Sequence, residues 1–168
     1  AANQKIIDSG LPLTIQNGGH IFTQQFWDNF LCMSGAGIVI GLVIYITFFA
    51  KSKSLRSLGK LSIVPNIFNI NEPIIFGTPI VLNPILSIPF LIMPCISSGL
   101  GYLVQSMGLV SLGYIVDPSF TPFFAQGFLS ALDIRNVIFM FVLIAISVVV
   151  YYPFFKVYEK NTLEHEGE

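Results

Sequence analysis

Glu72 is the residue whose type and position most strongly predict chemistry. It lies in the stretch NINEPIIFGTPIVLNP, residues 69–84, and is the only charged side chain between residues 61 and 116. Its carboxylate accepts hydrogen bonds, the amide of Asn71 both donates and accepts, and the proline that follows Glu72 frees a backbone carbonyl. A carboxylate beside an asparagine suits the hydroxyl groups of a sugar, and aromatic rings can pack on the sugar's C–H faces.

The composition indicates that this carboxylate belongs to a membrane protein. The chain has 168 residues, of which 54% are hydrophobic and 10% are charged, and its mean hydropathy is +0.76. An ordinary soluble domain has roughly 25% charged residues. Eight basic and nine acidic residues are too few to cover a globule of this size in water. The net charge of −1 gives no electrostatic reason to expect a nucleic-acid partner.

A carboxylate at membrane depth costs several kcal/mol, so an ionisable group there predicts a functional site. In transporters, helices that are broken near the middle of the membrane expose backbone groups and side chains to the substrate. The alternative interpretation is structural. Glu72 would then lie near the membrane interface and pair with Lys60 or Arg56.

The fold class that we predict is an all-α integral membrane protein with about three transmembrane helices and re-entrant hairpins formed by broken helices. Residues 29–50 carry no charge and would span about 33 Å as a helix. Four of the eight basic residues fall in 51–60, which predicts a cytoplasmic segment. The expected segments are an interfacial helix at 20–30, a span at 30–50, a cytoplasmic basic loop at 51–60, a re-entrant hairpin at 61–83, a span at 84–108, a re-entrant segment at 118–132, a span at 136–155 and a cytoplasmic tail at 156–168.

Two features of the apolar stretches affect how they pack. Prolines and asparagines interrupt 61–83, and non-helical backbone at membrane depth requires protein or a water-filled cavity to satisfy its polar groups. This pattern predicts the re-entrant hairpin. The segment GAGIVIG, residues 35–41, puts small residues on one helix face, which lets another helix approach closely.

Other residues that could carry chemistry have simpler interpretations. Cys32 and Cys95 lack metal-ligand spacing, so we interpret them as small apolar packing residues and expect neither a metal site nor a cofactor. His20 is interpreted as a surface or interfacial residue, with a substrate contact as the alternative. The spans carry no GxSxG, HExxH or paired-aspartate motif, which argues against an intramembrane hydrolase.

The stretch NINEPIIFGTPIVLNP, together with HIFTQQFWDNF, LGKLSIVPNIFNINEP and YYPFFKVYEK, resembles one family of membrane proteins. The sequence is similar to the C-terminal part of the sugar permease, enzyme IIC, of the phosphotransferase system, in its lactose/cellobiose/diacetylchitobiose class. The resemblance covers about residues 15–160. It implies that the chain is one segment of a longer permease that works as a homodimer in a bacterial plasma membrane.

The resemblance also implies a function and site residues. Permeases of this family bind a β-linked disaccharide and present it to the cytoplasmic IIB subunit, which IIA supplies with phosphate and which carries the phosphoryl group on a cysteine. Glu72 is then expected to bind a sugar hydroxyl near the phosphorylated position and to help deprotonate it. Asn71 is expected to be the adjacent contact, and Phe120 to stack on the sugar. The phosphocysteine belongs to IIB, so the phosphotransfer step is not expected of this chain alone.

A second function, from a different class, is a non-transporting scaffold or sensor in the membrane. Such a module would dock a cytoplasmic partner through the basic segment 51–60 and the tail. Neutralising Lys51, Lys53 and Arg56 would then abolish partner binding, whereas Glu72 would be dispensable.

Overall fold

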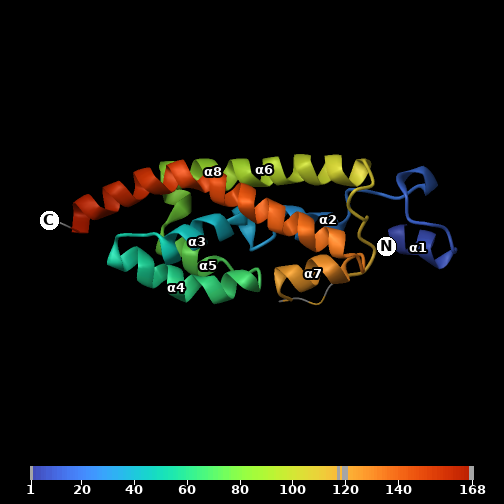
Figure 1. Ribbon diagram of the computed structural model, residues 1–168, viewed down its shortest axis with the longest axis horizontal. Helices are drawn as coiled ribbons and strands as arrows, with labels where there is room; N and C mark the ends of the chain where they lie inside the picture. The colour runs from blue at the N-terminus through green and yellow to red at the C-terminus, as the bar shows by residue number, and fades with distance from the viewer. Residues whose placement is uncertain (1, 117, 119–120, 167–168) are drawn as a thin grey trace.

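The computed structural model describes residues 2–116, 118 and 121–166, and every regular element in these ranges is helical. The all-α fold class predicted from the sequence is therefore confirmed (Figure 1). The α-helices are α1 (Ala2–Asp8), α2 (Gln24–Phe26), α3 (Ile40–Phe48), α4 (Lys53–Ile67), α5 (Glu72–Gly77), α6 (Pro84–Ser106), α7 (Phe123–Leu129) and α8 (Ile134–Glu166). Shorter helical turns are η1 (Ile15–Asn17), η2 (Trp27–Leu31), η3 (Ala36–Ile38) and η4 (Ile80–Leu82).

The two longest helices, α6 and α8, run along the long axis of the molecule (Figure 1). Helix α6 begins where the side chain of Asn83 accepts the backbone N–H of Ile85 at 2.9 Å. Helix α8 begins in the same way, because Asp133 accepts the N–H of Arg135 at 2.9 Å. Both helices are long and apolar enough to cross a membrane.

A third crossing is available only if a bent segment counts as one span. The stretch Gln24–Ile38 and the helix Ile40–Phe48 pass the same test together, with a bend of 46° between them. The described residues therefore include two helices that are long and apolar enough to cross a membrane, or up to three if the bent pair counts as one span.

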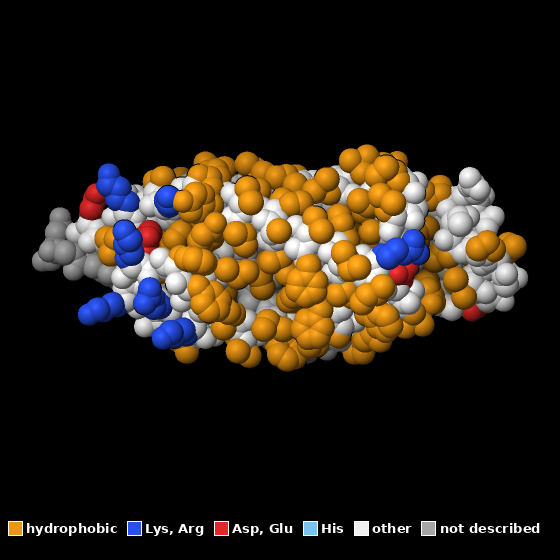
Figure 2. All heavy atoms as spheres, viewed as in Figure 1, with side chains coloured by type: hydrophobic (Ala, Val, Ile, Leu, Met, Phe, Trp, Pro, Cys, Tyr) orange, Lys and Arg blue, Asp and Glu red, His pale blue; other side chains and the backbone are white. Residues whose placement is uncertain are grey.

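Apolar side chains cover most of the visible surface, and basic side chains gather at one end (Figure 2). Several of the largest exposed side chains are fully apolar; Leu82, Phe76 and Val149 are 86%, 79% and 71% exposed. A water-facing surface rarely keeps such a continuous apolar area. This apolar belt is the part of the surface that suits lipid.

Helix α3 lies between α4 and α8 and contributes much of the core. Leu42 and Ile46 of α3 are fully buried, as are Met140 and Leu143 of α8. Gly41 permits this packing because a Cβ on it would lie 2.5 Å from the backbone carbon of Ser147. The close helix approach predicted for the small residues of 35–41 is thus found at Gly41.

Two segments have more helix than we expected. The basic segment 51–60, expected as a loop, is helical from Lys53, because the side chain of Ser52 caps the N–H of Leu55 at 3.2 Å. The tail from residue 156, expected to be too polar to fold alone, continues α8, since it extends a helix that is already nucleated. The segment 20–30 has less helix than expected and forms only the short turns α2 and η2.

Candidate functional site

The NINEP segment forms a tight turn between two helices. Helix α4 ends at Ile67, Asn69 takes a left-handed conformation with φ of 61°, and α5 begins at Glu72. The carbonyl of Asn71 accepts the N–H groups of Ile74 and Ile75 at 3.1 and 3.0 Å, which fixes the start of α5. The broken helix expected here from the prolines and asparagines is present, and its turn carries Glu72.

A second backbone break, at residues 34–38, faces this turn. Ser34, Gly35, Gly37 and Ile38 all have positive φ, between 48° and 81°, so no continuous α-helix can run through them. Helix α8 satisfies two carbonyls of the break. The hydroxyl of Tyr151 donates to Gly37 at 2.8 Å, and the hydroxyl of Ser147 donates to Ile38 at 2.7 Å.

Three asparagine side chains join the turn to the break, and we call Asn66, Asn69 and Asn71 the asparagine clamp. Asn69 accepts the backbone N–H of Ser34 at 2.7 Å, and Asn71 donates to the carbonyl of Ala36 at 2.6 Å. Asn66 accepts the hydroxyl of Ser34. Buried backbone groups must find such partners, so the clamp stabilises both non-helical segments.

The clamp also reaches α7 and Thr121, which precedes it. The amide of Asn69 donates to the side-chain oxygen of Gln126 at 2.6 Å and to the carbonyl of Thr121 at 3.2 Å. Three segments that are far apart in sequence therefore meet around one asparagine. Polar groups of these segments therefore bind one another within an otherwise apolar molecule.

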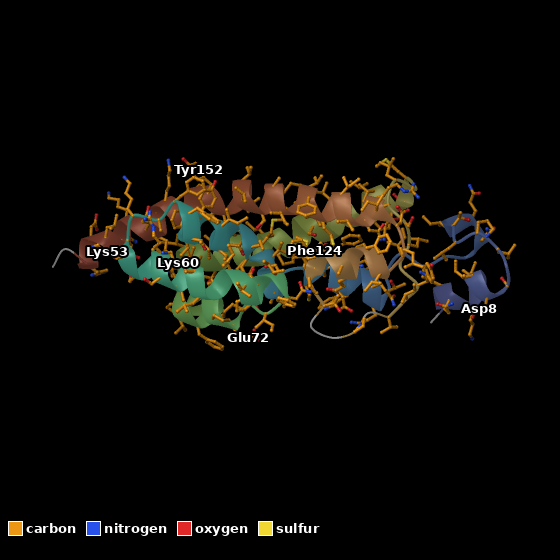
Figure 3. All side chains as sticks on the ribbon, turned by 60° about the horizontal axis from the view of Figure 1, so that its bottom comes forward. Asp8, Lys53, Lys60, Glu72, Phe124 and Tyr152 are labelled. Atoms are coloured by element: carbon orange, nitrogen blue, oxygen red, sulfur yellow. The ribbon has the colours of Figure 1, made fainter. Side chains whose placement is uncertain are left out.

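The side chain of Glu72 is exposed at the start of α5, beside the clamp. It lies part-way along the long axis, well away from the end that carries Lys53 (Figure 3). Among the described residues the ion pairs join Asp133 to Arg135 and Lys160 to Glu164, so Glu72 takes part in neither. Arg56, a partner in the alternative interpretation, instead donates to the carbonyl of Ala50 at 2.7 and 3.1 Å. The carboxylate is therefore available to a ligand.

Comparison with known proteins identifies the family of this chain. Residues 1–94 match the family model described as Phosphotransferase system, EIIC. The chain belongs to the EIIC family. It is 42% identical over 150 residues to the lichenan permease IIC component of Bacillus subtilis (strain 168), covering 88% of this chain and 33% of that protein.

Two further relatives extend the match. The EIIC chain is 34% identical over 152 residues to the lactose-specific EIICB component of Streptococcus mutans, covering 87% of this chain and 25% of that one. The crystal structure of the transporter ChbC, the IIC component of an N,N′-diacetylchitobiose-specific phosphotransferase system, superposes with a TM-score of 0.91 at 36% identity. That match covers 98% of this chain and 38% of ChbC. The EIIC chain thus spans about a third of the length of its relatives, and it is a membrane protein.

The remaining predicted site residues lie in different surroundings. Asn71 is only 5% exposed, and its amide is engaged by Ala36, so within the EIIC chain it supports the backbone beside Glu72. Its direct contact with a sugar stays a prediction. Phe120 lies outside the described residues. His20 is exposed, and its backbone forms a pair of hydrogen bonds with the side chain of Asn3 at 2.8 and 2.9 Å.

Sequence reasoning did not identify the break at 34–38 as part of the site. The small residues of this segment are equally compatible with a helix face that another helix approaches closely, and we interpreted them in that way. The signal that could have found it is the spacing of Gly35 and Gly37 after Ser34, because alternating glycines permit several positive φ values in succession.

Proposed function

We propose that this EIIC chain forms the part of a phosphotransferase-system permease that holds the sugar hydroxyl to be phosphorylated, with Glu72 as the binding group. The observation that carries the proposal is the exposed carboxylate of Glu72, which forms no ion pair with any residue that the structure describes. It lies at the edge of a turn that three asparagine side chains hold against a second backbone break. A charge in such surroundings is expensive to retain, which argues for a functional partner.

The chemistry of this partner follows from the carboxylate. An ionised carboxylate only accepts hydrogen bonds, so it would bind a hydroxyl by its proton and turn the oxygen lone pairs outward. As that oxygen forms a bond to phosphorus, the proton can pass to Glu72, and the bond between phosphorus and the IIB cysteine sulfur breaks. The asparagine clamp would keep the carboxylate fixed while this occurs.

The substrate that we propose is a β-linked disaccharide of the lactose, cellobiose or diacetylchitobiose type. Relatives named for lactose and for N,N′-diacetylchitobiose, each at least 34% identical to this chain, support this class. Both sugars carry the free primary hydroxyls that a carboxylate can orient.

The proposed partner is the cytoplasmic IIB subunit, and through it IIA. The lactose-specific relative is an EIICB component, which supports a functional pairing of IIC with IIB. Basic side chains gather at one end of the molecule, which supports a cytoplasmic position for that end (Figure 2). Four of the eight basic residues belong to segment 51–60, and two more, Lys156 and Lys160, belong to the last third of α8. We propose a multi-pass protein of a bacterial plasma membrane that is surrounded by lipid and works as a homodimer.

Replacing Glu72 by glutamine tests the proposal, because the amide keeps the size of the side chain and removes its charge. Uptake of radiolabelled cellobiose, lactose or diacetylchitobiose is measured in cells that express the permease with its IIB and IIA. We expect at least a hundredfold loss in Glu72→Gln, on the order of the effect of a general base, and none in Glu164→Gln, which makes the same change at an exposed site. Undiminished uptake by Glu72→Gln, at equal amounts of membrane-inserted protein, would remove Glu72 from the site.

The scaffold function makes the opposite prediction in the same cells. A docking module would lose its partner when Lys53 and its basic neighbours are neutralised, and it would keep that partner in Glu72→Gln. Co-purification of the partner with the two sets of variants therefore separates a permease from a scaffold.

A further inference from the structure

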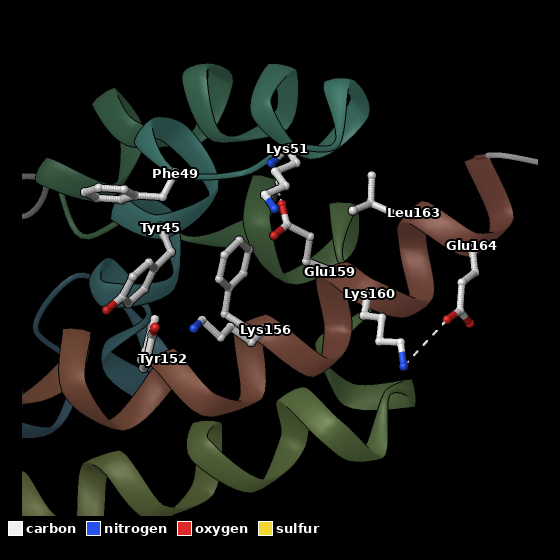
Figure 4. A pocket seen from close by; sticks show the side chains of 10 residues that line it. Tyr45, Phe49, Lys51, Tyr152, Lys156, Glu159, Lys160, Leu163 and Glu164 are labelled. Atoms are coloured by element: carbon white, nitrogen blue, oxygen red, sulfur yellow. Dashed lines mark hydrogen bonds and ion pairs between the residues drawn. The ribbon is translucent and has the colours of Figure 1, made fainter.

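A groove lies between the end of α3 and the last turns of α8, and Glu72 is not among the residues that line it (Figure 4). Its volume is about 640 Å³, enough for the headgroup of a phospholipid. We call it the basic groove; its lining includes the rings of Tyr45, Tyr152 and Phe155, the lysines Lys51, Lys156 and Lys160, and two carboxylates.

One wall of the basic groove is aromatic. The ring of Tyr45 lies 5.3 Å from that of Tyr152 and 5.4 Å from that of Phe155, measured between centroids. The ammonium group of Lys156 lies 4.4 Å from the centroid of Tyr152. The ring face thus positions this cation without neutralising its charge.

The lysines at the rim retain positive charge. Lys160 pairs with Glu164 at 3.9 Å, but both side chains are exposed, so the pair is weak. Glu159 is buried and accepts the backbone N–H of Lys51 at 2.5 Å. Within the described part of the chain, the side chains of Lys51 and Lys156 form no ion pair.

The lining of the groove combines lysines with aromatic rings, and basic side chains gather where the apolar belt ends (Figure 2). Phe48 and Phe49, at the end of α3, are 62% and 65% exposed beside it. A ligand that fits must carry a negative charge at the lysines and an apolar part along the aromatic rings. At a membrane boundary, tyrosine rings lie at the level of the lipid headgroups and lysines attract anionic headgroups.

We propose that the basic groove binds an anionic phospholipid, with its phosphate between Lys51 and Lys156 and its acyl chains along the apolar belt. The site is separate from the sugar site and does not depend on the proposed function. A phosphorylated protein would match the lysines but would leave the exposed phenylalanines at the mouth without an apolar partner. Phospholipid satisfies both parts of the surface.

Lipid binding to the purified membrane protein tests the inference, with phosphatidylglycerol and phosphatidylcholine of identical acyl chains as probes. Native mass spectrometry measures the affinity of each lipid for the wild type and for the double variant Lys51→Gln/Lys156→Gln. A lysine near an anionic headgroup contributes about a fivefold gain in affinity, so the double variant should bind phosphatidylglycerol about 25-fold more weakly. Lys53→Gln, the same change at an exposed residue outside the groove, should bind like the wild type.

Four results would overturn the inference. The double variant could bind phosphatidylglycerol as tightly as the wild type, or the wild type could bind phosphatidylcholine equally well. Soluble glycerol phosphate could also displace phosphatidylglycerol at equal concentration, which would identify a site for a free phosphate. Loss of IIB binding in the double variant, with lipid binding intact, would assign the groove to a protein partner and would equally refute the lipid site.

Discussion

Replacing Gly35 by alanine tests whether the break at residues 34–38 positions Glu72. Gly35 has φ of 81° and ψ of −174°, a region that is essentially restricted to glycine and costs other residues about 1–3 kcal/mol. The new Cβ would lie 2.3 Å from the side-chain Cγ of Asn71. Asn71 would have to move by about 1 Å to reach ordinary van der Waals contact.

That movement would break the hydrogen bond from Asn71 to the carbonyl of Ala36, which is 2.6 Å long. A buried polar group left without a partner costs about another 1–3 kcal/mol. Because Glu72 follows Asn71 directly, its carboxylate would shift with it, and a misplacement of about 1 Å can lower a rate about a hundredfold. Disaccharide uptake should therefore fall by about two orders of magnitude in Gly35→Ala.

The control for this experiment is Gly99→Ala on α6, where the added Cβ meets nothing within 4 Å. Alanine there favours the helix by about 0.5–1 kcal/mol, so uptake should stay within about twofold of the wild type. A second variant, Asn71→Ala, removes the hydrogen bond without the backbone strain, and we expect it to lose about tenfold in uptake. It keeps the hypothesis testable if Gly35→Ala inserts poorly into the membrane. Near-normal uptake by Gly35→Ala, at matched protein levels in the membrane, would refute the view that this break positions the carboxylate.

Two further predictions concern stability. Arg135 donates to the carboxylate of Asp133, and this hydrogen bond is the largest of several contacts, with Arg135 and the hydroxyl of Ser111, that lower the pKa of Asp133 from 3.8 to about 2. The ionised Asp133 therefore stabilises the fold fully above about pH 4, and this stabilisation is lost as the pH falls toward 2. Thermal unfolding in detergent should show a drop in Tm between pH 5 and pH 3 for the wild type and should lack this drop for Asp133→Asn. An identical drop in Tm for both proteins would contradict the prediction. Tyr151→Phe leaves the Gly37 carbonyl without its hydroxyl donor, so the free energy of unfolding of this variant should fall by about 1–3 kcal/mol. Tyr152→Phe makes the same change at an exposed neighbour and should leave the free energy of unfolding unchanged. Equal effects of the two substitutions would contradict the prediction.

The long helices were predictable because their signals are local. Charge-free apolar runs predicted spans at 84–108 and 136–155, and helices α6 (Pro84–Ser106) and α8 (Ile134–Glu166) include nearly all of those residues. The end of α8 was missed because a polar sequence gives no sign that an apolar helix will continue through it. The turn that carries Glu72 was predictable from its proline and asparagines.

The break at 34–38 could not be predicted in the same way, because distant residues stabilise it. Ile38 has φ of 48°, a value that a β-branched residue avoids unless its surroundings impose it. Those surroundings are the hydroxyl groups of Ser147 and Tyr151 and the side chain of Asn69, which are remote in sequence. Glu72 could therefore be proposed as a site residue from the sequence, whereas the segment 34–38 that supports its turn could not.

The hydrogen bonds at residues 34–38 have a mechanical consequence. This segment is tied on one side to the turn that carries Glu72 and on the other to the middle of α8, through five side chains. Separating segment 34–38 from this turn or from α8 would expose several polar backbone groups to an apolar interior, which costs too much free energy for small thermal motions to achieve. We therefore expect the turn that carries Glu72 to move together with α8, so that a large displacement of Glu72 across the bilayer would carry that whole helix along.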